Sequence, residues 1–76
     1  MDAQHVAFLR EVSKRDSWDG ADLAALAKRF RLTPAGALET LNEWSFERFD
    51  DLLIEEGDGY ELNPDIVMQL REMERP

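Results

Sequence analysis

Carboxylates at helical spacing are the residues of this chain whose types and positions could do chemistry. Glu39, Glu43 and Glu47 follow one another at intervals of four residues, so a helix would align them in one row. Like charges at this interval destabilise a helix by about 0.2–0.5 kcal/mol per pair, and a bound cation or a basic partner would relieve the repulsion. Four further carboxylates surround a glycine-rich turn later in the sequence: Glu55, Glu56, Asp58 and Glu61.

These side chains supply only oxygen ligands, which suit calcium or magnesium rather than zinc. The sequence around the turn does not match an EF-hand loop. Aligning the loop glycine with Gly57 or Gly59 places Leu52 or Ile54 at the first ligand position. A calcium or magnesium site here would therefore be irregular and weak. The alternative interpretation is a solvated acidic surface that keeps a small domain soluble.

The sequence contains little that could support catalysis. His5 is its only histidine and it has no cysteine, so Ser13, Ser17 and Ser45 lack an evident base partner. No glycine-rich phosphate loop is present either. We therefore expect a protein that is not an enzyme and that requires no cofactor.

The acidity is concentrated in one part of the sequence. The 76 residues carry 9 Lys and Arg against 17 Asp and Glu, a net charge of −8. Residues 1–31 hold six basic and five acidic side chains, whereas residues 32–76 hold three basic and twelve acidic ones. This balance disfavours nucleic-acid binding, which needs Lys and Arg to neutralise phosphates. The sequence also has no long apolar run and no N-terminal stretch that looks like a secretory signal, so we expect no helix that spans a membrane and no membrane partner.

The elements that would position the carboxylates follow from periodicity and capping. Apolar residues recur at helical spacing over residues 3–14, 19–31, 33–49 and 65–73, and Asp19, Thr33 and Asn63 are good N-caps. Residues 52–56 and 60–63 read as the strands of a β-hairpin, and Trp18 lies in an extended piece that could add a third strand. The length supports one small domain over residues 1–76.

This order of elements predicts an α+β fold that is mainly α. It is winged-helix-like, with three helices, a β-hairpin wing and a C-terminal helix; a plain helical bundle with a small hairpin is the alternative. A winged helix raises nucleic-acid binding as a competing function, in which the third helix would read the bases. That helix exposes the glutamate row and the wing carries the carboxylates of the turn, so both surfaces have the wrong sign.

Three side chains near the expected core have structural interpretations. Asn42 lies beside the stripe formed by Leu38 and Leu41, where a partly buried asparagine most often hydrogen-bonds a neighbouring backbone turn. Trp18 and Trp44 are interpreted as core residues. If they were exposed, they would instead indicate a protein interface.

Residues 36–63 resemble a known family. The resemblance rests on the runs Gly36-Ala37-Leu38-Glu39, Leu41-Asn42-Glu43-Trp44, Phe46-Glu47-Arg48-Phe49, Leu52-Leu53-Ile54-Glu55-Glu56 and Glu61-Leu62-Asn63. These runs are similar to the C-terminal domain of TerB-type tellurite-resistance proteins, called TerB-C. The region from Trp18 to Leu32 fits more loosely, and about two thirds of the chain is covered.

The resemblance implies a module from the C-terminus of a larger bacterial cytoplasmic protein. Its family context is stress response, including tellurite resistance and phage defence. It also implies metal chelation by acidic residues. Carried over to this sequence, the chelating residues would be Glu39, Glu43, Glu47, Glu55 and Glu56.

The leading hypothesis is a non-catalytic acidic module that binds a protein partner or another domain of its parent chain. The residues expected to meet this partner are Glu43, Glu47 and Asp58. The alternatives are a winged-helix domain that binds nucleic acid and a purely structural C-terminal cap of a multidomain protein.

Overall fold

The computed structural model describes residues 1–73, which form four helices and three short strands. The elements in chain order are α1 (Ala3–Val12), β1 (Ser17–Trp18), α2 (Gly20–Arg29), α3 (Pro34–Phe49), β2 (Ile54–Glu56), β3 (Tyr60–Leu62) and α4 (Pro64–Met73). This confirms the expected order. The end of α1 was predicted two residues too late, because the backbone N–H of Lys14 bonds the Glu11 carbonyl, only three residues back, at 3.2 Å.

The later helices begin where the capping residues predict. Asp19 and Thr33 each accept a hydrogen bond from the backbone N–H three residues on, at 2.7 and 3.2 Å. Asn63 accepts one from the N–H two residues on, at 3.0 Å. The cap also explains a glycine in the first turn of α3. A Cβ on Gly36 would lie 2.7 Å from the capping oxygen of Thr33.

The three strands form one antiparallel sheet in the order β1-β3-β2. In its register Trp18 faces Tyr60 across β1 and β3, and Ile54 faces Leu62 across β2 and β3. The indole Nε1 of Trp18 also donates to the carbonyl of Val12 at 2.9 Å, which ties β1 to the end of α1. The predicted third strand is therefore confirmed, and a plain helical bundle is ruled out.

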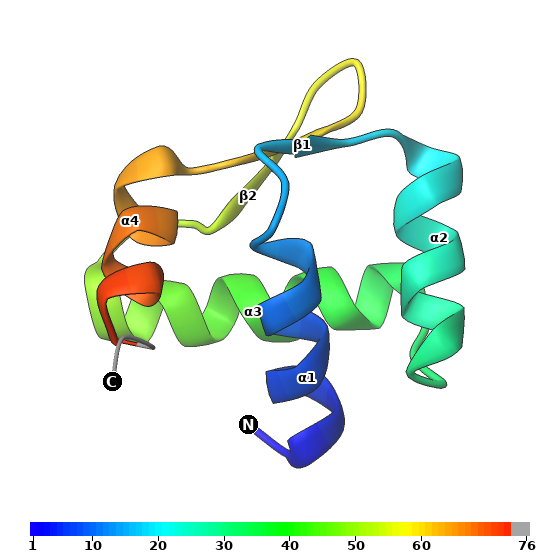
Figure 1. Ribbon diagram of the computed structural model, residues 1–76, viewed down its shortest axis with the longest axis horizontal. Coiled ribbons are helices and arrows are strands. Elements are labelled where there is room, and N and C mark those ends of the chain that lie inside the picture. Colours follow the sequence, from blue (N-terminus) through cyan, green and yellow to red (C-terminus); the bar gives the residue numbers. More distant parts are fainter. Residues whose placement is uncertain (74–76) are drawn as a thin grey trace.

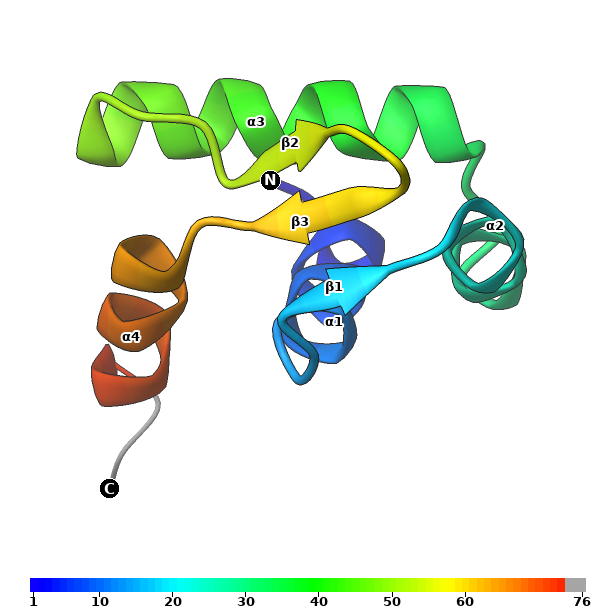
Figure 2. The same cartoon turned by 90° about the horizontal axis from the view of Figure 1, so that it is seen from above.

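The core lies where the helices meet the sheet. Its largest fully buried side chains come from all four helices and from the segment before β2. They include Phe8, Leu23, Leu41, Leu53 and Ile66. Helix α3 extends across the fold from α2 at one end to α4 at the other, with α1 between them (Figures 1 and 2). This winged-helix-like arrangement confirms the expected fold class. None of the helices within residues 1–73 has the length and apolarity needed to cross a membrane.

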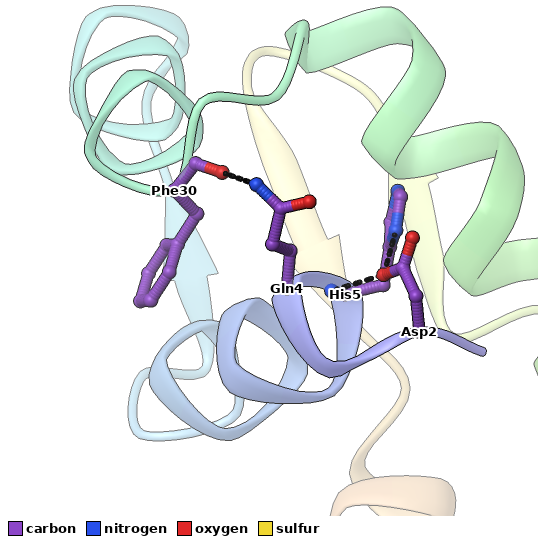
Figure 3. A network of polar contacts seen from close by, with 4 residues as sticks. All are labelled: Asp2, Gln4, His5 and Phe30. Atoms are coloured by element: carbon purple, nitrogen blue, oxygen red, sulfur yellow. Dashed lines mark hydrogen bonds and ion pairs between the residues drawn. The ribbon is translucent and has the colours of Figure 1, made fainter.

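Polar contacts hold the first turn of α1 (Figure 3). Oδ1 of Asp2 accepts from the backbone N–H of His5 at 2.9 Å and lies 2.7 Å from the Nδ1 atom of the same residue. These hydrogen bonds, the backbone one foremost, hold the pKa of the Asp2 carboxyl below its usual value. Nε2 of Gln4 donates to the carbonyl of Phe30 at 3.0 Å and joins α1 to the end of α2.

The hairpin turn offers a matched pair of glycines for testing the sheet. A Cβ added to Gly59 would lie 2.9 Å from the carbonyl oxygen of Trp18, whereas one added to Gly57 would meet no atom within 4 Å. We expect Gly59→Ala to lower the free energy of unfolding by about 1–3 kcal/mol, because β1 and β3 must separate to relieve the contact. Gly57→Ala should change it by less than about 0.5 kcal/mol. Urea unfolding followed by circular dichroism measures both, and equal effects would contradict this register.

Candidate functional site

Helix α3 positions most of the residues that the sequence singles out. Its sixteen residues make a rod about 24 Å long at the usual rise of 1.5 Å per residue. Leu41 and Ser45 on its inner side are fully buried, and the Ser45 hydroxyl donates to the carbonyl of Asp51 at 2.8 Å. The helix ends at Asp50, which adopts a left-handed conformation with φ of 57° and turns the chain back towards β2.

The outer side of α3 carries the predicted glutamate row. Glu39, Glu43 and Glu47 are all exposed, as their spacing predicts. Figure 2 shows α3 at the edge of the fold, with β2 along one flank and no element covering its outer side. We call this surface the acidic face and define it by Glu39, Glu43, Phe46 and Glu47.

Phe46 is a member of the acidic face that sequence reasoning missed. It lies three residues after Glu43 and one before Glu47, and 55% of its surface is exposed. A signal was available, because Phe46 falls outside the spacing of the buried stripe formed by Leu38, Leu41 and Ser45. A large aromatic ring on the polar side of a helix is a common mark of a protein interface.

The hairpin places a second set of carboxylates in solvent. Glu55 of β2 and Glu61 of β3 face each other across the two strands, which is unfavourable for like charges. Glu56 faces Tyr60 in the same register, and Asp58 is exposed at the turn. As on α3, the repulsion would be relieved by a cation or a basic group.

Asn42 connects α3 to the hairpin. Its side-chain oxygen accepts from the backbone N–H of Ile54 at 2.9 Å, and its Nδ2 donates to the carbonyl of Ile54 at 3.0 Å. The sequence predicted that Asn42 would bond a neighbouring turn of the chain. The predicted partner is wrong, because Asn42 bonds a strand residue twelve positions later in the chain. The contact sets the position of the hairpin carboxylates relative to the acidic face.

The structure does not gather the predicted metal ligands. Within residues 1–73, no three His, Cys, Asp or Glu side chains come together where they could hold a metal ion. On α3 the reason is the rise of the helix, which sets Glu39 and Glu47 about 12 Å apart along the axis, too far for one ion with bonds of about 2.4 Å. A calcium or magnesium site that uses Glu39, Glu43 or Glu47 with Glu55 and Glu56 stays a prediction.

Two of the groups that could do acid–base or nucleophilic chemistry make structural contacts. His5 interacts with the capping carboxylate of Asp2, and the hydroxyl of Ser45 is taken by a backbone carbonyl. The hydroxyl of Ser13 is buried and has no hydrogen-bond partner among the described residues. Within residues 1–73 no serine hydroxyl hydrogen-bonds the imidazole of His5, so this part of the chain presents no nucleophile and base in contact.

The two tryptophans are half-buried and pack against the core, as predicted. The ring of Trp44 meets that of Phe49 edge to face, with centroids 5.7 Å apart. The guanidinium of Arg15 lies 4.1 Å from the ring centroid of Trp18 and covers part of its outer surface. Neither indole belongs to the acidic face.

Comparison with protein families identifies a match that covers most of the sequence. The family model described as the TerB-C domain matches residues 1–71, which is nearly the whole chain. No match was found among curated proteins or among solved structures.

Proposed function

The chain belongs to the TerB-C domain family, and from this membership and its acidic face we propose that it is a non-catalytic binding module of a bacterial TerB-type stress-response protein. Its ligand is a basic segment of a protein partner or of another domain of the parent chain. The acidic face of α3 makes the main contact, and the hairpin carboxylates, with Asp58 at the turn, extend it.

The observation that carries the proposal is the exposed ring of Phe46 among three glutamates. An aromatic side chain that loses its solvent on binding supplies most of the affinity in many interfaces. Carboxylates around it would steer a basic segment and favour it over acidic competitors. The surface therefore fits a partner with one apolar pocket or stripe bordered by Lys or Arg.

The same charges argue against nucleic acid as the ligand. In a winged-helix arrangement the recognition surface would be the outer side of α3 and the wing would be the hairpin turn. Glu39, Glu43 and Glu47 occupy the first, and Glu55 and Asp58 lie at the second. Each of these carboxylates would repel a phosphate. Favourable counterion release requires Lys or Arg to neutralise phosphates, and these two surfaces offer carboxylates in their place.

Fluorescence anisotropy with two labelled probes tests this proposal. The first probe is a helical peptide with a leucine stripe flanked by lysines, called here the lysine peptide, and the second is a mixed-sequence duplex DNA. We expect the lysine peptide to bind at low ionic strength and to weaken as salt is added, since exposed charge pairs are screened. We expect no DNA binding under the same conditions. Tight, salt-sensitive DNA binding with no peptide binding would contradict the proposal.

Divalent cations are proposed to bind these carboxylates only weakly. Pairs such as Glu55 and Glu61, which face each other across the hairpin, could share one hydrated ion, but two carboxylates fall short of the six to eight oxygens that calcium prefers. In an NMR titration we expect small shifts of the Glu43 and Gly57 amides at millimolar calcium or magnesium. Sodium chloride at equal ionic strength is the control, and identical shifts in both titrations would end the cation proposal.

A further inference from the structure

The turn between α2 and α3 is a surface of opposite sign to the acidic face. We call residues 28–32 the basic corner, and their sequence is Lys28-Arg29-Phe30-Arg31-Leu32. The three cations are exposed, whereas Phe30 and Leu32 are half-buried and pack against the core. Figures 1 and 2 both show this corner at one end of the molecule, where α2 meets the start of α3. The corner thus alternates basic and apolar residues on a chain whose net charge is −8.

The cations of the basic corner are not taken up by salt bridges. Within residues 1–73, no carboxylate forms a salt bridge with Lys28, Arg29 or Arg31. The pKa of the Glu11 carboxyl is lowered foremost by its hydrogen bond with Lys14 and also by the charge of Arg29. Because Glu11 already pairs with Lys14 at 2.9 Å, it offsets Arg29 only in part. Lys28 and Arg31 have no paired carboxylate in this part of the chain.

Arg31 adopts a backbone conformation that favours glycine. Its φ is 59°, in the left-handed region. The backbone N–H of Leu32 bonds the Ala27 carbonyl at 2.9 Å and that of Arg31 bonds the Lys28 carbonyl at 3.0 Å, so Arg31 occupies the position after a helix end at which glycine is most common. An L-residue is strained there and glycine is not. Such strain is often retained for function, and the side chain that it places on the surface here is a guanidinium.

From these observations we infer that the acidic face of one copy of this chain binds the basic corner of a second copy. The inference rests on the proposed function, and it identifies the basic segment that the acidic face binds. That face fits an apolar surface bordered by Lys or Arg, and residues 28–32 are such a segment. Three carboxylates meet three cations, and a guanidinium of the corner stacks on the exposed ring of Phe46.

Helix α3 keeps the two surfaces of one copy apart. Glu43, in the middle of the glutamate row, lies about 14 Å along the helix axis from Pro34, where the helix begins. The basic corner directly precedes that start, so it cannot cover the row of its own copy. Since the two surfaces differ, the contact is heterologous, and copies add to one another head to tail.

Two variants that each keep one of the two surfaces test the inference. The face variant carries Glu39→Gln, Glu43→Gln and Glu47→Gln, and the corner variant carries Lys28→Gln, Arg29→Gln and Arg31→Gln. Sedimentation equilibrium is run at about 0.15 M salt, where repulsion between the net charges is largely screened beyond about 8 Å. We expect the unmodified chain to associate as its concentration is raised, and each variant alone to associate about tenfold more weakly. An equimolar mixture should form one-to-one pairs, because the face variant keeps its corner and the corner variant keeps its acidic face.

The net charges of the variants separate this contact from a general effect of charge. The face variant is less negative than the unmodified chain, so it would associate more strongly if net charge alone governed association. That result, or a mixture that stays monomeric, would overturn the inference. An unmodified chain that binds the lysine peptide but does not associate would also overturn it and would leave the proposed function in place. Failure of both would overturn both.

NMR with one labelled variant locates the contact. When the face variant alone carries ¹⁵N, adding the unlabelled corner variant should shift the amides of residues 28–32. When the corner variant alone is labelled, adding the face variant should shift those of residues 39–47. Largest shifts on α1 or α4 would mean that the copies meet through another surface, and would overturn the inference.

Arg31→Gly separates association from folding. It removes a cation at a position that favours glycine, so the urea midpoint of the free chain should stay the same or rise. Self-association should weaken by about threefold, as expected for the loss of one exposed charge from the contact. Unchanged association with a preserved midpoint would overturn the inference, because it would show that the guanidinium of Arg31 does not contact the acidic face.

Discussion

Replacing Asn42 by alanine is expected to lower the free energy of unfolding by about 2–4 kcal/mol, because it leaves two buried backbone groups without partners and each costs about 1–3 kcal/mol. The groups are the N–H and the carbonyl of Ile54, a residue that is only 3% exposed. Asn42 thus links α3 to β2 through both a donor and an acceptor of one side chain. The hairpin should therefore lose its fixed position on α3 as well as part of its stability.

Two further variants sharpen this prediction. Asn42→Asp keeps the size of the side chain but sets an anionic oxygen against the Ile54 carbonyl, so we expect a loss at least as large as that of Asn42→Ala. Glu39→Ala, on the exposed side of the same helix, should change stability by less than about 0.5 kcal/mol. Urea unfolding monitored by circular dichroism measures all three. If Asn42→Ala costs no more than Glu39→Ala, the contact does not position the hairpin.

Neutralising the acidic face should separate binding from folding. In the combined variant Glu39→Gln, Glu43→Gln and Glu47→Gln, we expect binding of the lysine peptide to weaken by about tenfold, since exposed charge pairs contribute about 0.2–1 kcal/mol each. Stability should hold or rise, because the two like-charge pairs along the row disappear. Phe46→Ala should weaken binding further, by about thirtyfold, as expected for a central aromatic contact worth about 2 kcal/mol.

A matched variant with the same change in net charge provides the control. Asp16→Asn, Asp65→Asn and Glu72→Gln remove three exposed carboxylates that lie outside the acidic face and the hairpin. Anisotropy with the labelled lysine peptide compares the two triple variants. Equal loss of binding would show that only the overall charge matters and that the acidic face is not the site. Unchanged binding in Phe46→Ala would show that the ring of Phe46 does not contribute to binding of the lysine peptide.

Features of this fold that depend on local geometry could be predicted from the sequence. Asp19 and Thr33 mark helix starts because capping involves only a few neighbouring residues, and both caps are present. The glutamate row on α3 follows from the helical period alone. The third strand at Trp18 needed more, because its pairing with Tyr60 spans forty-two residues, yet the order of elements was enough to suggest it.

Features that depend on packing between distant segments were not predictable in this way. The partner of Asn42 is a strand residue whose distance from α3 is set by the sheet and the core, so the predicted structural role of Asn42 was right but its predicted partner was wrong. The hydrogen bond from Arg71 to the carbonyl of Ser13 is a clearer case, since the two residues are fifty-eight positions apart and meet only in the folded chain. The spacing between the α3 row and the hairpin carboxylates is likewise a property of tertiary structure, which is why ligand identity alone could not define a metal site.

We propose above all that the outer side of α3 recognises a basic protein segment. The most direct test is a ¹⁵N NMR titration of the intact chain with the lysine peptide, read residue by residue. We predict that the largest shifts fall on the amides of residues 39–47, with smaller ones at the hairpin, and that they vanish in the Glu39→Gln, Glu43→Gln and Glu47→Gln variant. Largest shifts on α1 and α4, or shifts that persist in that variant, would contradict the account.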